Sequence, residues 1–320
     1  MKIVKAIGVC ALVLALVAPA AAQDKMITIG ISQIVEHPAL DAARQGFIDA
    51  LAKHGYVEGK NVTYDIQIAQ GNMATANSIG KALVGKKVDL IHSIATPTSQ
   101  ACVNATKDIP IIISSVTDPV GAGLVESLER PGGNVTGTTD RSPVDRQVDL
   151  ILEIVPGLKK LGFIYNSGED NSISSLNQLK EECAKRGIQV VEATVSNSSG
   201  VFMAAKSLVG RVDAIHIPTD NTVVSAFESV VKVCEDNRIP LFAADIDSVP
   251  RGAIAALAID YYRLGWQSGE MAVRVLQGAD PATMPVETLK DMKLYVNTQA
   301  AQRMGVTIPE AVVKRADKVL

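Results

Sequence analysis

The chain has 320 residues, of which 47% are hydrophobic and 4% aromatic, and its 31 basic and 34 acidic side chains leave a net charge of −3. This length is enough for one or two packed α/β domains. The chain has no cluster of lysine and arginine, so it lacks the basic stripe that a phosphate backbone requires, and nucleic acid is excluded as an expected partner.

The first 22 residues have the pattern of a cleaved signal peptide. Lys2 and Lys5 precede an apolar stretch at 6–18, and small residues lie before Gln23 as at a signal cleavage site. The stretch is shorter than the roughly 20 residues of a transmembrane helix. We therefore expect export to a Gram-negative periplasm without a lipid anchor, and loss of the two lysines takes the net charge from −3 to −5.

Apolar, strand-like runs alternate with amphipathic segments of helix length from Ile27 onward, which predicts a parallel α/β sheet with helices on both faces. In the first helix, Leu40, Phe47 and Leu51 share one apolar stripe, and Pro38 takes the first helical position. In the first half we expect strands at 27–32, 62–68, 89–94 and 110–115, and helices at 38–54, 73–84 and 98–107.

The second half of the chain repeats this plan. The letters LVG at 83–85 precede VDLIH at 88–92, and LVG at 208–210 precedes VDAIH at 212–216. Two similar α/β units in one chain form a cleft between them, and ligands bind beyond the carboxyl ends of parallel strands. In this half we expect strands at 160–165, 189–195, 213–218 and 240–244, and helices at 174–186, 201–209 and 222–237.

Separated segments of the chain also carry a family resemblance. The letters SQIVEHPALD at 32–41, PTDNT at 218–222, GAIAAL at 252–257 and IDYYRLG at 259–265 resemble the ABC transporter substrate-binding family that includes tryptophan- and tyrosine-binding proteins. The resemblance covers essentially the whole mature chain. It implies the α/β fold of type I periplasmic binding proteins, in which two Rossmann-like lobes are joined by a three-segment hinge.

The same resemblance implies a lobe map and a mode of action. The crossings would fall near 134–138, 255–260 and 278–285, giving an N-terminal lobe of 23–136 plus 259–280 and a C-terminal lobe of 137–258 plus 281–320. Hinge closure would trap a small polar ligand between the lobes. An amino acid is favoured, aromatic above all, while branched-chain amino acids, small carboxylates and nucleosides remain open. The implied partner is an inner-membrane ABC permease with its ATPase, and neither a cofactor nor a metal is expected.

Polar residues at the strand ends of the first lobe are candidates for holding the carboxylate of such a ligand. Hydroxyls and the N–H groups at a helix N-terminus both favour an anion. The alternative is that the hydroxyls only cap helices. The candidates are Ser32, Gln33 and His37 after the first strand, Thr96, Thr98 and Ser99 after the third, and Ser115, Thr117 and Asp118 after the fourth.

Acidic residues at the strand ends of the second lobe are candidates for holding an ammonium group. Asp245 is the first choice and Asp220 the second, although both could serve only as helix N-caps. Tyr165 could add an apolar wall or simply pack between sheet and helix. The candidates in this lobe are Asn166, Glu169, Asp220, Asn221 and Asp245.

The remaining histidines and cysteines favour structural roles. His92 and His216 occupy equivalent places in two expected strands and are read as core residues rather than metal ligands. Cys102, Cys183 and Cys234 match no zinc or CxxC spacing, and an odd number leaves at least one free thiol. We expect inert buried thiols, with a disulfide between Cys183 and Cys234 as the alternative.

Three rival classes of function are weaker. The chain has no G-x-G-x-x-G after a strand, no Walker loop and no G-x-S-x-G, so catalysis is not expected, although a hydrolase on the same fold remains an alternative. A repressor is disfavoured by the signal peptide and by the lack of a helix-turn-helix. A sensor that signals through a membrane receptor stays open as well.

Overall fold

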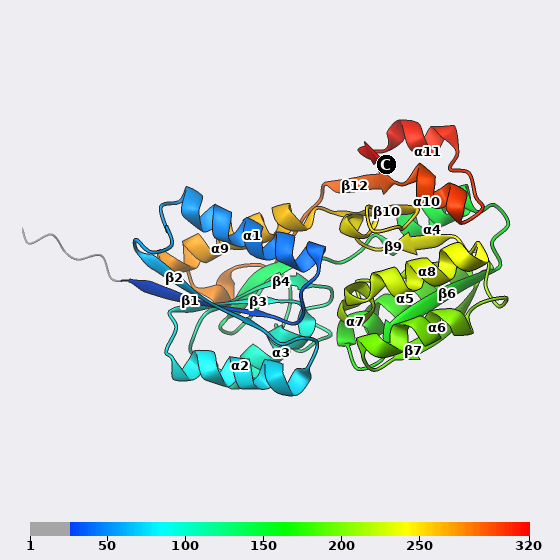
Figure 1. The fold of residues 1–320 in the computed structure, drawn as a ribbon. Coiled ribbons are helices and arrows are strands. Elements are labelled where there is room, and N and C mark those ends of the chain that lie inside the picture. The colour runs from blue at the N-terminus through cyan, green and yellow to red at the C-terminus, as the bar shows by residue number, and fades with distance from the viewer. Residues whose placement is uncertain (1–25) are drawn as a thin grey trace, which may run out of the picture.

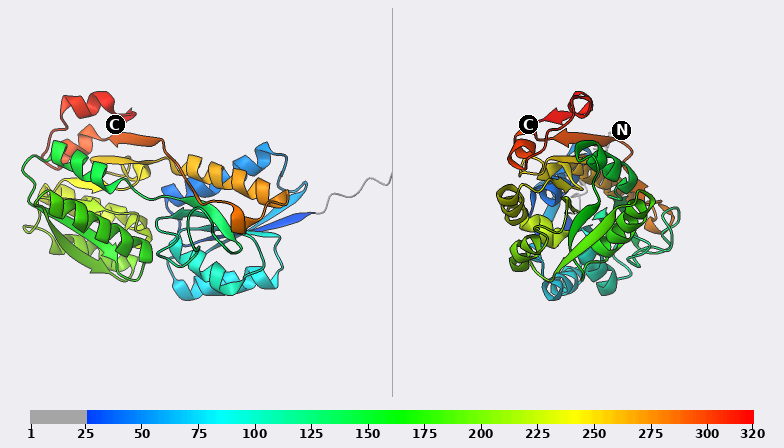
Figure 2. Two further views of the ribbon diagram at one scale, coloured as in Figure 1. Left: turned by 180° about the vertical axis from the view of Figure 1, so that it is seen from behind. Right: turned by 90° about the vertical axis from the view of Figure 1, so that its right-hand side faces the viewer.

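The computed structural model describes residues 26–320, which form two lobes, each with a twisted sheet covered by helices (Figures 1 and 2). This confirms the expected fold class of two parallel α/β units. The expected signal peptide lies outside the described residues. Within 26–320, no helix is both long and apolar enough to cross a membrane.

The first lobe is built on a six-stranded, all-parallel sheet in the order β11-β5-β4-β3-β1-β2. The inner strands are buried along their whole length, as expected for a sheet with helices on both faces. The strands are β1 (Ile27–Gln33), β2 (Val62–Ile68), β3 (Leu90–Ile94), β4 (Ile111–Val116), β5 (Val135–Thr139) and β11 (Glu287–Thr288). The helices are α1 (Pro38–Lys53), α2 (Met73–Gly85), α3 (Thr96–Ala105) and α9 (Tyr261–Leu276).

The second lobe has a seven-stranded sheet in the order β13-β12-β10-β9-β8-β6-β7, in which only the β10 and β12 pair is antiparallel among the described strands. The strands are β6 (Lys160–Asn166), β7 (Gln189–Val195), β8 (Ala214–Ile217), β9 (Leu241–Ala243), β10 (Ala255–Ile259), β12 (Met292–Val296) and β13 (Lys318–Val319). The helices are α4 (Val144–Ile154), α5 (Asp170–Lys185), α6 (Val201–Ser207), α7 (Asn221–Ser225), α8 (Phe227–Asn237), α10 (Thr298–Arg303) and α11 (Glu310–Arg315).

The lobes are joined by three crossings of the chain, which follow β5, β10 and β11. In the view from behind, Figure 2 shows the segment that leads to β12 passing between the lobes. The lobe limits predicted at 136 and 280 remain predictions. The strands nearest to these limits, β5 and β11, both lie in the first sheet. The chain therefore passes from the first sheet to the second a few residues after each limit. The physical reason is that β5 pairs with β4 through Thr139.

Three local expectations were wrong in detail, one of them the helix expected at 174–186, which begins at Asp170. The helix expected at 222–237 is divided into α7 and α8 at Ala226, and the helix expected from Thr98 begins at Thr96. Pro38, in contrast, begins α1 as expected, with His37 as its N-cap. Pro97 explains the earlier start of α3, since proline is well tolerated in the first helical turn.

Helices α1 and α9 pack at the closest distance that two backbones allow. A Cβ added at Gly265 would lie 1.8 Å from the carbonyl oxygen of Ala43, and one added at Gly46 would lie 2.0 Å from that of Tyr262. Because only glycine fits at these two positions, the contact between α1 and α9 fixes how the two helices lie against each other. His37 and Tyr261, at the N-terminal ends of α1 and α9, both reach the space between the lobes.

Candidate functional site

A small cavity lies between the lobes, at the carboxyl ends of the parallel strands. Its volume is about 20 Å³, which is little more than the space that a single water molecule needs. The first lobe contributes residues after β1, β4 and β5 and at the start of α9, and the second lobe contributes residues after β8 and β9. The lining residues are His37, Ala39, Leu40, Ser115, Asp140, Thr219, Asp220, Asn221, Val224, Asp245 and Tyr261.

Three carboxylates line this cavity, and none of its described lining residues is a lysine or arginine. Asp140 comes from the crossing after β5, whereas Asp220 and Asp245 come from the second lobe. All three are nearly inaccessible to solvent, at 4%, 0% and 3% exposed. A buried carboxylate without a cationic partner is energetically unfavourable, so a positively charged group placed beside these side chains would be stabilised.

Asp140 is held by two hydroxyl groups. Thr117 Oγ1 donates to its Oδ1 at 2.9 Å, and the Tyr261 hydroxyl donates to its Oδ2 at 2.6 Å. Burial raises the pKa of Asp140, and these two hydrogen bonds counteract part of that rise. Each carboxylate oxygen therefore keeps acceptor capacity for a further donor in the cavity.

Asp220 is both a cavity residue and a structural cap. Its Oδ1 accepts the Val223 N–H at 2.7 Å, and its Oδ2 accepts the Asn166 N–H and the Ser172 hydroxyl, each at 2.6 Å. Burial, followed by repulsion from the Glu169 carboxylate, raises the pKa of Asp220 to about 7. The expected N-cap role of Asp220 is thus present together with its place in the cavity.

Asp245 has the same double position. Its Oδ1 accepts the Ser248 N–H at 2.8 Å and its Oδ2 accepts the Ser248 hydroxyl at 2.7 Å, which caps the 3₁₀ turn at Ile246–Ser248. Burial raises the pKa of Asp245, while Arg251 is among the groups that lower it. Its two oxygens make fewer bonds than those of Asp220, so Asp245 is the freer of the two acceptors.

Glu169 and Asn166 serve the scaffold around the cavity and do not line it. Glu169 accepts hydrogen bonds from the backbone and side chain of Asn221 and of Thr222 at 2.6–3.2 Å, so it holds the start of α7. Asn166 donates through its side chain to Thr222 at 2.9 Å. Glu169 thus positions Asn221, which does reach the cavity, while Asn166 positions Asp220 and Thr222 beside it.

In the first lobe the backbone is strained where it meets the cleft. Ala95, after β3, has φ of +80°, and Ser115, at the end of β4, has φ of +56°, which non-glycine residues rarely adopt. The hydroxyls of Ser115 and Thr96 are buried without a hydrogen-bond partner in the described residues. Strained residues with unpaired polar atoms are typical of binding sites.

The other first-lobe candidates are satisfied by their own surroundings. Thr98 donates to the Ile94 carbonyl at 2.6 Å and Ser99 to that of Ala95 at 2.9 Å. Gln33 bonds to Asp41 and to Arg44, which ties β1 to α1. Ser32 is the exception: it is fully buried outside the cavity lining, and its hydroxyl makes no hydrogen bond of good geometry among the described residues, although it lies beside the Cys102 thiol.

His37 lines the cavity as a neutral ring. Burial, with a smaller contribution from Arg251, lowers its pKa to about 3. Its Nδ1 faces the Leu40 N–H at 3.5 Å and caps α1, so its ring is fixed in orientation. His37 therefore adds no positive charge to offset the three carboxylates at neutral pH.

Side chains from the two lobes also bond directly across the cleft. Thr219 and Thr117 hydroxyls lie 3.1 Å apart, and because Thr117 donates to Asp140, the proton between the two must come from Thr219. At the rim, the Ser174 hydroxyl donates to Asp118 at 3.3 Å. These bonds exist only while the lobes are together.

His92, His216 and the cysteines of the described residues are core residues, whereas His54 is exposed and contacts Glu270. His92 stacks on Phe47 with ring centres 3.7 Å apart and bonds to Ser114 at 3.0 Å, and His216 packs near Phe163. The three cysteines within 26–320 are buried free thiols, as expected, so no disulfide joins Cys183 to Cys234. Tyr165 does not line the cavity, and its hydroxyl donates to Glu192 at 2.8 Å.

Sequence reasoning missed three polar cavity residues, Asp140, Thr219 and Tyr261, as well as the apolar Ala39, Leu40 and Val224. Thr219 and Tyr261 lie inside the segments that carry the family resemblance, but no role was assigned to them. Asp140 follows a strand that was taken as a crossing, and its contact with Tyr261 joins residues 121 positions apart. The available signal was the acidic residue directly after TGTT at 136–139.

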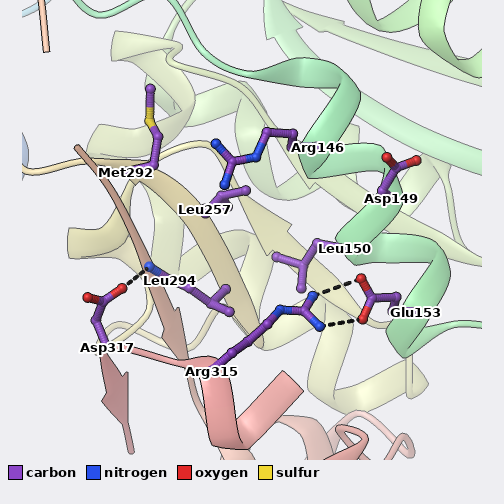
Figure 3. Close-up of a pocket in the computed structure, with 9 residues that line it drawn as sticks. All are labelled: Arg146, Asp149, Leu150, Glu153, Leu257, Met292, Leu294, Arg315 and Asp317. Atoms are coloured by element: carbon purple, nitrogen blue, oxygen red, sulfur yellow. Dashed lines mark hydrogen bonds and ion pairs between the residues drawn. The ribbon is translucent and has the colours of Figure 1, made fainter. Parts of the chain in front are cut away.

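A larger hollow of about 300 Å³ lies on the second lobe, between α4, β10 and β12. Figure 3 shows that much of its charge is already paired. Arg315 forms two hydrogen bonds of 2.7 Å with Glu153, and Asp317 accepts from the Leu294 N–H and from Lys293. The inter-lobe cavity, with its unpaired carboxylates, is the better candidate site.

Comparisons with known proteins agree with this architecture. Residues 28–320 match the family described as ABC transporter substrate binding protein. The chain is 48% identical over 282 residues to the "Tyrosine-binding protein" of Clostridioides difficile (strain R20291), covering 88% of this chain and 82% of that protein.

Two solved structures resemble the chain to different degrees. An ABC domain from Streptococcus pneumonia in complex with L-Trp is 38% identical with a TM-score of 0.89, and covers 92% of this chain and 99% of its own. A substrate-binding protein with adhesive properties from Clostridium difficile, in its ligand-free, open structure, is 43% identical with a TM-score of 0.69, at the same coverage. The two are similarly related in sequence but differ clearly in shape similarity.

Proposed function

This chain belongs to the ABC transporter substrate binding protein family, and from that membership we propose that it captures an aromatic amino acid, tyrosine or tryptophan, in the cavity between its lobes. It is a solute-binding component and works with an ABC permease. We propose further that it acts in the periplasm after signal cleavage and delivers its ligand to an inner-membrane permease with an ATPase.

The observation that carries this proposal is the acidic cavity with carboxylates from both lobes. An amino acid brings an ammonium group, which Asp140, Asp220 and Asp245 attract and can accept hydrogen bonds from. Its carboxylate needs donors: the unpartnered hydroxyl of Ser115 lines the cavity, and the unpartnered hydroxyl of Thr96, at the N-terminal end of α3, lies outside the present lining and would have to be reached as the side chains rearrange around the ligand. The site residues thus match both charged ends of a zwitterion.

The apolar part of the lining supports an aromatic side chain. Leu40, Val224 and the ring of Tyr261 surround the same cavity, and flat rings gain most from burial against such surfaces. The relative named for tyrosine and the structure that contains L-Trp point in the same direction. Aromatic amino acids are therefore favoured over sugars and nucleosides.

Closure of the lobes explains how the ligand is held. The chain matches the L-Trp complex with a TM-score of 0.89 and the open structure with only 0.69, which supports a closed arrangement of its lobes. A cavity of about 20 Å³ is far too small to admit an amino acid from solvent. The lobes must separate at the three crossings for the ligand to enter, and the lining side chains must rearrange around it.

The hydrogen bond between Thr219 and Thr117 should contribute to ligand affinity through closure. Thr219→Val keeps the shape of the side chain but removes the donor, so the closed form loses about 1 kcal/mol, a typical value for one hydrogen bond. We expect tyrosine to bind about fivefold more weakly by calorimetry. Thr283→Val, at an exposed position, is the matched control. Unchanged affinity in Thr219→Val would show that this bond does not favour closure.

Thermal shift of the chain from residue 23 onward tests the proposed ligand. A ligand that binds only the folded state at 100 times its Kd adds about 2.7 kcal/mol of stability. We expect tyrosine and tryptophan to raise the Tm by several degrees, and sugars, nucleosides and dicarboxylates to leave it unchanged. A response to another class would replace the ligand assignment, and no response from folded protein would favour the sensor or hydrolase alternative.

A further inference from the structure

The two sides of the closed cleft carry charges of the same sign. Asp140 belongs to the end of the first sheet, while Asp220 and Asp245 belong to the second lobe, and all three face one cavity. Asp245 is close enough to act electrostatically on Asp140. Closing the lobes therefore brings buried carboxylates together and removes water from them, both of which are unfavourable while all are ionised.

The surrounding groups do not supply the missing positive charge. Arg251 is the guanidinium that acts on Asp245, but its Nε and Nη2 form ion pairs of 2.7 and 2.8 Å with Glu228, and its Nη1 donates to the Val224 carbonyl. His37 is neutral, and the Tyr261 hydroxyl and Thr117 donate hydrogen bonds without charge. Glu169 acts on Asp220, and Asp245 acts on Asp247, which is itself affected by Asp260 and Lys318.

Most of the ionisable groups beyond the cavity lining are acidic and add negative charge around it. Asp247 is affected by both Asp245 and Asp260, and burial together with these charges raises the pKa of Asp247 to about 7. Lys318 acts on Asp247 from the C-terminal strand β13, and the Lys318 side chain also lies 5.4 Å from the centre of the Tyr295 ring. The excess of negative charge thus extends from the cavity along the second-lobe side of the hinge.

From this arrangement we propose that the cleft is an electrostatic gate: repulsion between Asp140 and the second-lobe carboxylates Asp220 and Asp245 keeps the lobes apart until a positive charge lies between them. The ammonium group of the ligand is one such charge, and this part rests on the proposed function. Protonation of the carboxylates, which removes their negative charge, is the other way to relieve the repulsion. The gate thus selects ligands by their ammonium group and responds to pH without any ligand.

The direction of the pH effect follows from proton linkage. In the open form Asp140 and Asp245 would regain contact with water, whereas burial in the closed form raises the pKa of both; the pKa of Asp220, about 7, is raised by burial and by Glu169 of its own lobe, which stays beside it on opening. The closed form therefore binds more protons, so acidification favours closure. A protonated carboxyl group attracts the ligand's ammonium group less strongly than a carboxylate does. Ligand affinity should therefore fall as the pH is lowered.

Small-angle X-ray scattering of the ligand-free protein tests the gate directly. Between pH 7.5 and pH 5 we expect the radius of gyration to fall to the value that saturating tyrosine produces at pH 7.5. Asp140→Asn should be compact without ligand at both pH values, and Asp245→Asn serves the same purpose if the first variant does not fold. Asp236→Asn, exposed and paired only with Lys232, is the matched control and should behave as the unaltered chain.

Ligand analogues test the ammonium requirement at the same time. Tyrosine should bind at pH 7.5 at least tenfold more tightly than at pH 5, and 3-(4-hydroxyphenyl)propanoic acid, which lacks only the ammonium group, should not compact the protein. A ligand-free radius of gyration that is equal at both pH values would overturn the gate, even if tyrosine binds. Acid compaction without any binding of tyrosine would instead refute the proposed ligand and leave the gate standing.

Discussion

Gly265→Ala should destabilise the first lobe by about 3 kcal/mol, which is large for the addition of one methyl group. The new Cβ would lie 1.8 Å from the carbonyl oxygen of Ala43 and 2.5 Å from its carbonyl carbon. These are backbone atoms inside α1, so no side chain can move aside and the two helices must separate. Overpacking of this kind typically costs about 1–3 kcal/mol and sometimes more.

The same substitution should also weaken ligand binding. His37 begins α1 and Tyr261 begins α9, so separating the helices displaces two residues of the cavity lining. The Tyr261 hydrogen bond to Asp140, now 2.6 Å, would lengthen as α9 moves. Urea unfolding and calorimetry with tyrosine would measure both losses in one variant.

Gly85→Ala is the matched control for this experiment. Gly85 is exposed at the end of α2, its φ is not positive, and a Cβ added there meets no atom within 4 Å. Because alanine has the better helix propensity, this variant should be as stable as the unaltered chain or more stable by up to about 1 kcal/mol. If both variants unfold at the same urea concentration, the close packing of α1 on α9 does not determine stability.

Local sequence patterns were sufficient to predict most of the scaffold. Strand and helix positions follow from apolar periodicity, and the start of α1 follows from Pro38. The carboxyl-end rule also predicts Ser115, Asp220 and Asp245 at the cleft, where all three line the cavity. That rule works because a parallel sheet brings all its strand ends to one edge.

The composition of the cavity was harder to predict because it depends on contacts between distant segments. Gln33 and Glu169 also lie at strand ends, but each bonds to a partner within its own lobe. Gln33 bonds to Asp41, and Glu169 bonds to Thr222. Asp140, in contrast, reaches the cavity only because the chain crosses between the lobes beside it. No pattern within a single strand and helix distinguishes these cases.

Asp220→Ala should be the most destabilising change in the cavity, with a loss of about 3–4 kcal/mol in the free energy of unfolding. It leaves the Val223 and Asn166 N–H groups and the Ser172 hydroxyl without an acceptor in a fully buried position. Each unsatisfied buried donor costs about 1–3 kcal/mol, reduced where water can enter the space left by the carboxylate. Asp220→Asn keeps one acceptor for the Val223 cap and should lose roughly half as much.

The pH dependence of stability separates the charge of Asp220 from its hydrogen bonds. Its folded-state pKa is raised to about 7, so its contribution to stability is fully present below the unfolded pKa and is lost as the pH rises through about 7. The unaltered chain should therefore have a lower Tm at pH 8 than at pH 5.5, with a smaller decrease in Asp220→Asn. Since Asp140, Asp245 and Asp247 are raised in the same direction, part of the slope should remain in that variant. An identical slope in both proteins would mean that Asp220 does not titrate in this range, and that its place in the cavity depends on its hydrogen bonds alone.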